Sequence, residues 1–286
     1  METLTLNNGL RMPVLGIGVN HVPSAEVGPA LAHAFEAGYR SVDTANTYLN
    51  ERAVGRAVRD SGLAREEVFL TTKLWSTDSG YTRARAAIDR TLKRIGTDYL
   101  DLLLLHQQYG DYNGAWRAFQ EAVAAGKVRS IGVSNFNPRR LADLIGRART
   151  VPAVVQVERH PYFQQRELRA FLEPLGTAVE AWFPLGHGDA GLLAEPLFAE
   201  LGRKYGKSPV QVILRWHVQD GGIVIPGSTD PDHIRSNAAL FDFALTSEEM
   251  DRIALMDRNR RFHNLPEFVE GIVFQAMRTD YDRKQR

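Results

Sequence analysis

Eight short apolar segments, each followed by a stretch of helical periodicity, constrain the fold of this chain more than any other feature of its sequence. The segments are almost continuously apolar, which is typical of parallel strands that are covered on both faces. We expect strands over residues 14–18, 40–43, 68–74, 99–106, 130–133, 154–157, 178–182 and 223–226. Because eight such strands with intervening helices close into a cylinder of about 250 residues, the sequence predicts an α/β fold, the (β/α)8 TIM barrel.

The predicted helices begin with recognisable capping residues. Asn137, Ser208 and Asp230 each precede a proline, which places a capping side chain directly before the first helical position. Thr246 begins a capping box, and residues 84–95 and 115–125 repeat their apolar positions near the helical period. No linker divides the chain, so we expect residues 1–286 to form a single barrel domain.

Two segments fall outside the eightfold pattern. Residues 3–12 contain an Asn-Gly turn between short strand-like runs and predict a β-hairpin, which we expect to plug the bottom of the barrel. Residues 258–286 form a polar and aromatic tail. The tail either packs over the mouth of the barrel or stays free of it.

The charge balance and the absence of cysteine exclude several classes of function. With 35 Lys and Arg against 34 Asp and Glu, the chain lacks the basic excess that binds nucleic acid or an anionic membrane. Without cysteine it has no disulfide, thiolate metal site or cysteine nucleophile. Its apolar runs are shorter than a membrane span of about 20 residues, and its first residues do not resemble a signal peptide. We therefore expect a cytoplasmic enzyme that acts on a small molecule.

Polar side chains gather where the predicted strands end, and barrels of this kind carry their active site at the carboxyl ends of the strands. Asp43, Lys73 and His106 end the second, third and fourth strands, and Tyr48 follows Asp43 closely. Only six of the 35 basic residues are lysines, yet one of them stands at a strand end. A buried ammonium needs an anionic partner, and Asp43 on the neighbouring strand is the candidate.

These four residue types suit the reduction of a carbonyl group. The unperturbed pKa of tyrosine is about 10, and we expect the Lys73 ammonium to lower the pKa of Tyr48, which then acts as a general acid or base. A histidine beside it can orient the carbonyl oxygen, and Asp43 keeps the lysine charged. The hydride must come from a cofactor, and no metal is expected.

Other interpretations of the same residues stay open. Lys73 and Asp43 can form a structural ion pair at the rim, and His106 can be a core residue. Lys73 can also form a Schiff base in a lyase of the aldolase type. Finally, the scaffold can belong to a non-catalytic or regulatory binding protein, because a fold does not determine a function.

A series of motifs across nearly the whole chain carries a resemblance to a known family. The motifs occupy residues 38–45, 48–51, 72–75, 105–106, 132–136, 156–158, 160–161, 164–165, 184–186 and 225–226. In order and spacing they resemble the aldo-keto reductases, and they are most similar to the bacterial diketogluconate reductase-like branch. The resemblance implies NAD(P)H-dependent reduction of aldehydes or ketones by a monomeric protein.

The resemblance also assigns roles to individual residues. The implied catalytic tetrad, in which Tyr48 donates the proton, consists of Asp43, Tyr48, Lys73 and His106. The residues expected to hold the nicotinamide carboxamide are Ser134, Asn135 and Gln156, and Trp182 is expected to stack on the nicotinamide ring. The stretch expected to line the pyrophosphate and adenosine contains Leu185, Gly186, Ser228, His233 and Asn237.

Two departures from the family pattern bear on the cofactor. Most relatives place Lys at the position of Gly227 and Arg at that of His233, where the two cations bind the 2′-phosphate of NADPH. Without them the phosphate loses its charge-assisted hydrogen bonds. We therefore expect a weakened preference for NADPH and appreciable use of NADH, unless the nearby Arg235 compensates.

The predicted substrate pocket departs from the family as well. Asn20 stands where relatives often carry an aromatic residue, and Gln107 and Gln108 replace a frequent Trp-Pro pair. The remaining residues expected to line the pocket are Trp75, Tyr109, Tyr112 and Phe136. The exchange of aromatic for amide side chains favours a small polar carbonyl substrate over a flat aromatic one.

Overall fold

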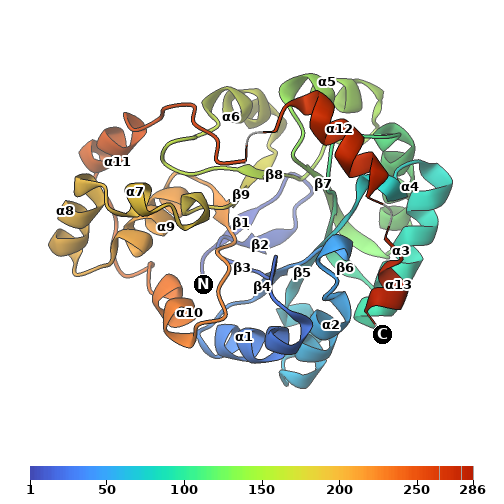
Figure 1. Cartoon of the computed structure of the whole chain (residues 1–286), viewed down its shortest axis with the longest axis horizontal. Coiled ribbons are helices and arrows are strands. Elements are labelled where there is room, and N and C mark those ends of the chain that lie inside the picture. The colour runs from blue at the N-terminus through green and yellow to red at the C-terminus, as the bar shows by residue number, and fades with distance from the viewer. Residues whose placement is uncertain (264, 278, 286) are drawn as a thin grey trace.

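The computed structural model describes residues 1–263, 265–277 and 279–285, and its centre is a closed barrel of parallel strands (Figure 1). The strands follow one another around the barrel in chain order: β3 (Ile17–Gly18), β4 (Ser41–Asp43), β5 (Phe69–Leu74), β6 (Leu100–Leu105), β7 (Val128–Ser134), β8 (Val154–Glu158), β9 (Ala178–Trp182) and β10 (Ile223–Val224). A parallel bridge between Leu15 and Val224 joins the last strand to the first. The predicted (β/α)8 fold is confirmed.

The helices surround the barrel and begin as the capping residues predict. They are α1 (Ser24–Glu36), α2 (Glu51–Asp60), α3 (Tyr81–Ile95), α4 (Tyr112–Ala124), α5 (Pro138–Arg147), α6 (Arg166–Leu172), α7 (Ala190–Leu193), α8 (Pro196–Tyr205), α9 (Pro209–Gln219), α10 (Pro231–Ala238) and α11 (Ser247–Ala254). The side chains of Asn137, Ser208, Asp230 and Thr246 each accept a backbone N–H at the start of their helix. Among the described helices, none is long and apolar enough to cross a bilayer.

The predicted strand boundaries differ most from the observed ones at the first and last strands, where the barrel closes. The segments 14–18 and 223–226 pair continuously over only two residues each, Ile17–Gly18 and Ile223–Val224. Single hydrogen bonds continue the contact between them, such as Gly18 N to Pro226 O at 3.3 Å. In contrast, β7 begins two residues before its predicted start at Ser130, because Arg129 points outward from a strand that is otherwise buried.

A hairpin plugs the bottom of the barrel, as the sequence predicts. Its strands, β1 (Thr3–Thr5) and β2 (Arg11–Pro13), pair antiparallel. The buried side chains of Leu6 and Met12 pack against Phe69, Leu102 and Val154, which point into the barrel. Apolar side chains therefore fill the centre of the barrel bottom, and Asn8 of the hairpin donates a hydrogen bond to Ser130 of β7 at 2.6 Å.

The described part of the tail packs over the barrel mouth, which settles the two alternatives that the sequence leaves open; residues 264, 278 and 286 lie outside the described part. Its helices are α12 (Glu267–Ala276) and α13 (Tyr281–Lys284). The carbonyl oxygen of Phe274 in α12 accepts hydrogen bonds from Trp75 Nε1 and Ser76 Oγ, both at 2.9 Å. Figure 1 shows α12 lying over the rim near α4 and α5.

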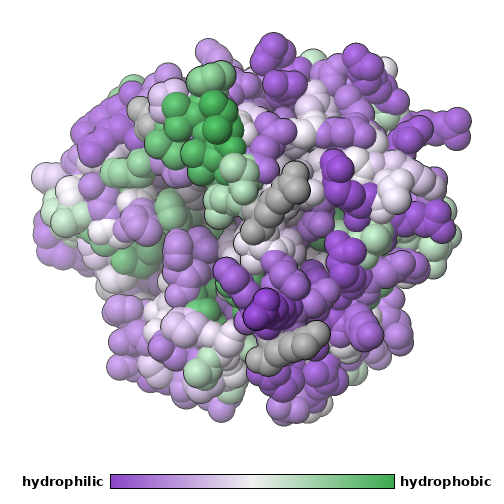
Figure 2. Space-filling model, turned by 45° about the vertical axis from the view of Figure 1, so that its right-hand side comes forward, coloured by the Kyte–Doolittle hydropathy of each residue, from purple (hydrophilic) through white to green (hydrophobic). Residues whose placement is uncertain are grey.

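The outer face of α12 is apolar and exposed. Phe268 is 78% exposed and Ile272 is 56% exposed, and Val269 and Val273 flank them. They form the green area in the upper part of Figure 2. The opposite face of the helix points to the barrel and contacts Tyr109, whose hydroxyl donates to Glu270 at 2.9 Å.

Candidate active site

Lys73 is the centre of a buried hydrogen-bond cluster at the carboxyl ends of β4 and β5. Its ammonium donates to a carboxylate oxygen of Asp43, to the carbonyl oxygen of Thr44 at 3.1 Å and to the hydroxyl of Tyr48 at 3.2 Å. Asp43 and Lys73 are 2% and 0% exposed, whereas Tyr48 is only partly buried. Tyr48 is therefore the most exposed residue of the three.

Local structure fixes the loop that carries Tyr48. A short 3-10 turn over Asn46–Tyr48 follows β4 and ends at Leu49, which has a left-handed backbone with φ 60°. The Asn50 side chain then donates to the carbonyl oxygens of Val19 and Val22 at 2.9 and 3.1 Å. Because Asn50 is 1% exposed, these bonds hold the loop firmly beneath the mouth.

The pKa values of Lys73 and Tyr48 in this cluster are shifted from their usual values. Burial alone would lower the pKa of Lys73, but Asp43 and Tyr48 raise it above its usual value. Burial raises the pKa of Tyr48, and the ammonium of Lys73 offsets only part of that effect. Lys73 lowers the pKa of Tyr48 as the sequence predicts, but loss of hydration outweighs the neighbouring charge, so the pKa lies above its usual value. Tyr48 remains a protonated phenol at neutral pH.

His106 completes the group and is neutral. It follows β6, and its ring lies edge-on to Tyr48, with 5.7 Å between ring centroids, and to Trp75, with 5.0 Å. Burial, and after it the charge of Lys73, hold the pKa of His106 well below its usual value. A neutral imidazole can donate one N–H to an oxygen atom placed beside Tyr48.

A second set of polar side chains lies next to this group, at the ends of β7, β8 and β9. Asn135 has a left-handed backbone, with φ 61°, and bridges two other site residues. Its amide nitrogen donates to the carbonyl oxygen of His106 at 3.1 Å, and its amide oxygen accepts from Trp182 Nε1 at 2.9 Å. Asn135 thereby fixes the half-buried Trp182 ring relative to His106.

Gln156 and Ser134 lie beneath this bridge. The Gln156 amide nitrogen donates to Asp43 at 2.9 Å and to Glu180 at 2.7 Å, and its oxygen accepts from Ser134 at 3.4 Å. Both residues are at most 2% exposed. The amide and hydroxyl groups of this set match the donors and acceptors of a carboxamide.

Comparison with known proteins agrees with this geometry. The model of the aldo/keto reductase family matches residues 14–258. An aldo-keto reductase of Mycolicibacterium smegmatis is 45% identical over 261 residues, which cover 90% of this chain and 94% of that protein. The glyoxal reductase of Bacillus subtilis is 42% identical over 262 residues, which cover 91% of this chain and 94% of that protein.

A crystal structure of a Bombyx mori aldo-keto reductase in complex with NADP has a TM-score of 0.89 and 34% sequence identity, and the match covers 94% of this chain and 97% of that one. The chain belongs to the aldo/keto reductase family. It is an NAD(P)H-dependent oxidoreductase, as the sequence predicts. The narrower assignment to the diketogluconate reductase-like branch stays a prediction.

In this aldo-keto reductase, the residues predicted to bind the nicotinamide carry amide and hydroxyl groups that can form hydrogen bonds with its carboxamide. Those selected for the rest of the cofactor lie on the loops after β9 and β10 and on α10. Gly186 has φ 59° and is buried, and an added Cβ would come within 2.7 Å of the Phe262 ring. Ser228 accepts the backbone N–H of Asp230 at 3.1 Å, and Asn237 is buried on α10.

The predicted pocket residues divide into two groups. Trp75 packs against His106, Gln107 is half-buried directly after His106, and Asn20 is exposed in the turn after β3. Tyr112 and Phe136 instead pack against each other in the core, with ring centroids 5.4 Å apart. Their expected place in the pocket is wrong, because both side chains point into the apolar layer between strands and helices.

Three contributing residues are absent from the sequence predictions. Glu180 lies beneath Gln156 and could have been found, since it is the one charged residue in the apolar run 178–182. Glu158 accepts the backbone N–H groups of Phe262, at 2.5 Å, and His263, and so holds the start of the tail. Phe274 packs on Trp75, with ring centroids 5.0 Å apart. No local pattern in the sequence reveals a contact across 199 residues.

Proposed function

We propose that this aldo-keto reductase reduces small, polar aldehydes and ketones to alcohols, with Tyr48 as the proton donor. The observation that carries the proposal is the hydrogen bond from buried Lys73 to the hydroxyl of Tyr48, beside the neutral ring of His106. A protonated phenol next to an ammonium is suited to give its proton to an oxygen that gains negative charge. We further propose that residues 1–286 act as one barrel domain.

Each side chain has a distinct task in this proposal. His106 donates a hydrogen bond to the carbonyl oxygen and orients it toward the Tyr48 hydroxyl. Lys73 stabilises the phenolate that remains after proton transfer, and Asp43 keeps Lys73 charged. A bound nicotinamide cofactor would supply the hydride. Ser134, Asn135, Gln156 and Trp182 would hold the nicotinamide in register with the carbonyl carbon.

A Schiff-base lyase receives no support from the surroundings of Lys73. An amine must lose its proton before it attacks a carbonyl group. All three ammonium hydrogens of Lys73 have protein acceptors, and Asp43 and Tyr48 raise its pKa although burial opposes them. The groups that make Lys73 a good electrostatic partner for Tyr48 therefore make it a poor nucleophile.

We propose that NADH is used appreciably, because acidic groups dominate the start of α10. Asp230 accepts the backbone N–H groups of Asp232 and His233 at 2.8 and 3.0 Å. Arg235, the nearby cation that could compensate, is paired with Asp232. A 2′-phosphate in this region would meet two carboxylates, and Arg235 would have to leave its partner to bind it.

The amide side chains near the mouth favour an oxygenated substrate. Asn20 and Gln107 offer donors and acceptors, and Trp75 leaves an apolar surface beside His106. The Bacillus subtilis relative is named a glyoxal reductase, and glyoxal is small and oxygenated. We propose short dicarbonyls and hydroxyaldehydes as the first compounds to assay.

The direct test combines a binding measurement with a turnover measurement. Quenching of tryptophan fluorescence by NADH and by NADPH gives the two affinities, and turnover is followed on a panel of small carbonyls. We expect Tyr48→Phe to bind cofactor as the wild type does and to lose at least about 100-fold in kcat. If the variant retains wild-type turnover, Tyr48 is not the proton donor.

The cofactor preference is tested at His233 and Asp230. His233→Arg adds a cation, and Asp230→Asn removes a charge while keeping a side chain that can cap the helix. We expect the double variant to shift the ratio of affinities toward NADPH by about tenfold. Gly227→Lys is unsuitable as a test, because its Cβ would lie 2.9 Å from the carbonyl oxygen of Gly18, where the barrel closes. An unchanged ratio would contradict the assignment.

A further inference from the structure

Glu180 is a buried carboxyl group for which the proposed reaction has no role. It lies in the middle of β9, in register with Gln156 of β8 on one side and Ile223 of β10 on the other. Its side chain is 0% exposed. One oxygen, Oε2, accepts from the Gln156 amide at 2.7 Å, and among the described residues the other oxygen, Oε1, has no hydrogen-bond partner.

The charges around Glu180 do not balance if it is ionised. The charged groups that face it are Asp43 of β4 and Lys73 of β5, with Tyr48 beyond them, while β10 contributes the apolar Ile223. Lys73 directs its three hydrogens to Asp43, Thr44 and Tyr48. Of the two carboxyl groups, Asp43 and Glu180, only Asp43 accepts a hydrogen bond from the Lys73 ammonium. A second buried anion without a cation is strongly unfavourable.

We propose that Glu180 is a positioning residue of the reductase site, a carboxylic acid that stays protonated at neutral pH and fixes the orientation of Gln156. Its proton is on Oε1, so that Oε2 is free to accept from the amide of Gln156. Because Asp43 and Glu180 take both amide hydrogens, Gln156 can offer the cofactor only its oxygen. This orientation rests on the proposed role of Gln156 toward the nicotinamide.

A neighbouring carboxyl group provides the contrast. Glu158 of β8 is 1% exposed, yet it accepts hydrogen bonds from His160, at 3.2 Å, and from two backbone N–H groups. Burial alone would raise the pKa of Glu158, but these donors hold it below its usual value. Burial, and then the charge of Asp43, instead raise the pKa of Glu180 to about 8. The pKa values of the two glutamates thus shift in opposite directions, because Glu158 has His160, two backbone N–H groups and Arg261, at 3.7 Å, as partners, whereas Glu180 has one amide.

Loss of the Glu180 proton would change the pKa of Tyr48. A new negative charge disfavours the tyrosine phenolate and so raises the pKa of Tyr48 further. Alcohol oxidation requires the phenolate as a base, whereas carbonyl reduction requires the phenol. Ionised Glu180 should therefore slow the oxidation at alkaline pH in the wild type, and this effect should be absent from Glu180→Gln.

The charge state can be measured without turnover, by infrared spectroscopy of the full chain. Difference spectra between the wild type and Glu180→Gln should contain the C=O stretch of a protonated carboxylic acid at about pH 6.5 and lose it by about pH 9.5. Difference spectra with Glu158→Gln, the matched control, should contain a carboxylate band at both pH values. A carboxylate band for Glu180 at about pH 6.5 would overturn the proposal.

The coupling to Tyr48 is measured with the same variants. We compare kcat/KM for alcohol oxidation in Glu180→Gln with that in the wild type. The ratio of variant to wild type should rise at least threefold between about pH 7 and pH 9. Glu180→Asp, which keeps the carboxyl group, should not show this rise. A ratio that does not change with pH would overturn the coupling. Because the infrared result needs no reaction, a failure of the proposed function stays distinguishable from a failure at Glu180.

Discussion

Each hydrogen of the Lys73 ammonium has one acceptor, and the three acceptors give the residue two separate functions. Through Asp43 it neutralises a carboxylate that is 2% exposed, which concerns stability. In the proposed mechanism its contact with Tyr48 stabilises the phenolate that proton transfer leaves behind, which concerns catalysis. The two functions can be measured separately, because the first affects the free energy of unfolding and the second affects turnover.

Replacement of Lys73 by methionine should therefore have two effects. The variant leaves Asp43 as an unpaired buried anion, and we expect it to lower the free energy of unfolding by about 3–5 kcal/mol. Adding Asp43→Asn should restore most of that loss, whereas turnover should stay reduced by about 100-fold or more in both variants. Urea unfolding and steady-state kinetics measure the two quantities. Equal instability of the single and double variants would refute the electrostatic explanation.

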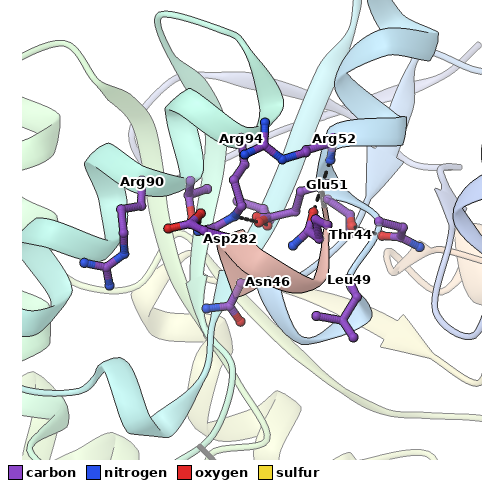
Figure 3. Close-up of polar contacts among 12 residues, drawn as sticks. Thr44, Asn46, Leu49, Glu51, Arg52, Arg90, Arg94 and Asp282 are labelled. Atoms are coloured by element: carbon purple, nitrogen blue, oxygen red, sulfur yellow. Dashed lines mark hydrogen bonds and ion pairs between the residues drawn. The ribbon is translucent and has the colours of Figure 1, made fainter. Parts of the chain in front are cut away.

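At the scale of elements, the final helix is fixed to the barrel by a cluster behind the site (Figure 3). Arg94 of α3 forms ion pairs with Glu51 of α2, at 2.6 Å, and with Asp282 of α13, at 2.9 Å. Glu51 also accepts from Thr72, the residue before Lys73, at 2.8 Å. The cluster thus joins the tail to β5, the strand that carries Lys73.

The members of this cluster should contribute unequally. Glu51 is 0% exposed, so Arg94→Met would leave a buried carboxyl group without its cation, and we expect a loss of about 3–5 kcal/mol. The Asp282 side chain is 38% exposed, and Asp282→Asn should cost about 1 kcal/mol or less. Urea unfolding of the two variants compares them directly. Similar losses would mean that the exposed pair with Asp282, and not the buried pair with Glu51, accounts for the contribution of Arg94 to stability.

The sequence predicts elements well where one local pattern decides them. Eight strands, four capped helices and the hairpin are all present, because apolar periodicity and capping residues act over a few positions. The pairing of Asp43 with Lys73 also follows, since consecutive parallel strands bring their ends together. The packing of Phe274 on Trp75 and the burial of Tyr112 depend on contacts that are distant in the chain, and no pattern within a strand or helix encodes them.

At the scale of the whole molecule, the barrel is closed below and covered above. The hairpin fills the bottom, and α12 covers the rim of the mouth from Trp75 to Tyr109. The Trp75 ring lies between His106 and Phe274, with 5.0 Å to each ring centroid. Trp75 therefore connects the tail to His106.

Phe274→Ala should loosen Trp75 and widen the mouth. We expect the KM for small carbonyls to rise about fivefold, since a lost aromatic contact costs about 0.5–1.5 kcal/mol, with little change in cofactor affinity. Phe268→Ala is the matched control, because Phe268 lies on the same helix and is 78% exposed. Steady-state kinetics of both variants should show the change only in the first. An unaltered KM in Phe274→Ala would mean that α12 does not shape the pocket.

Isotope transfer can test whether Tyr48 supports carbonyl reduction with hydride from a nicotinamide cofactor. The wild type and Tyr48→Phe are incubated with glyoxal and with NADH or NADPH deuterated at the transferring position, and the product is analysed by mass spectrometry. We expect one deuterium on the alcohol carbon with the wild type and almost none with the variant, although both bind cofactor. Unlabelled alcohol from the wild type, or equal labelling by Tyr48→Phe, would contradict this expectation.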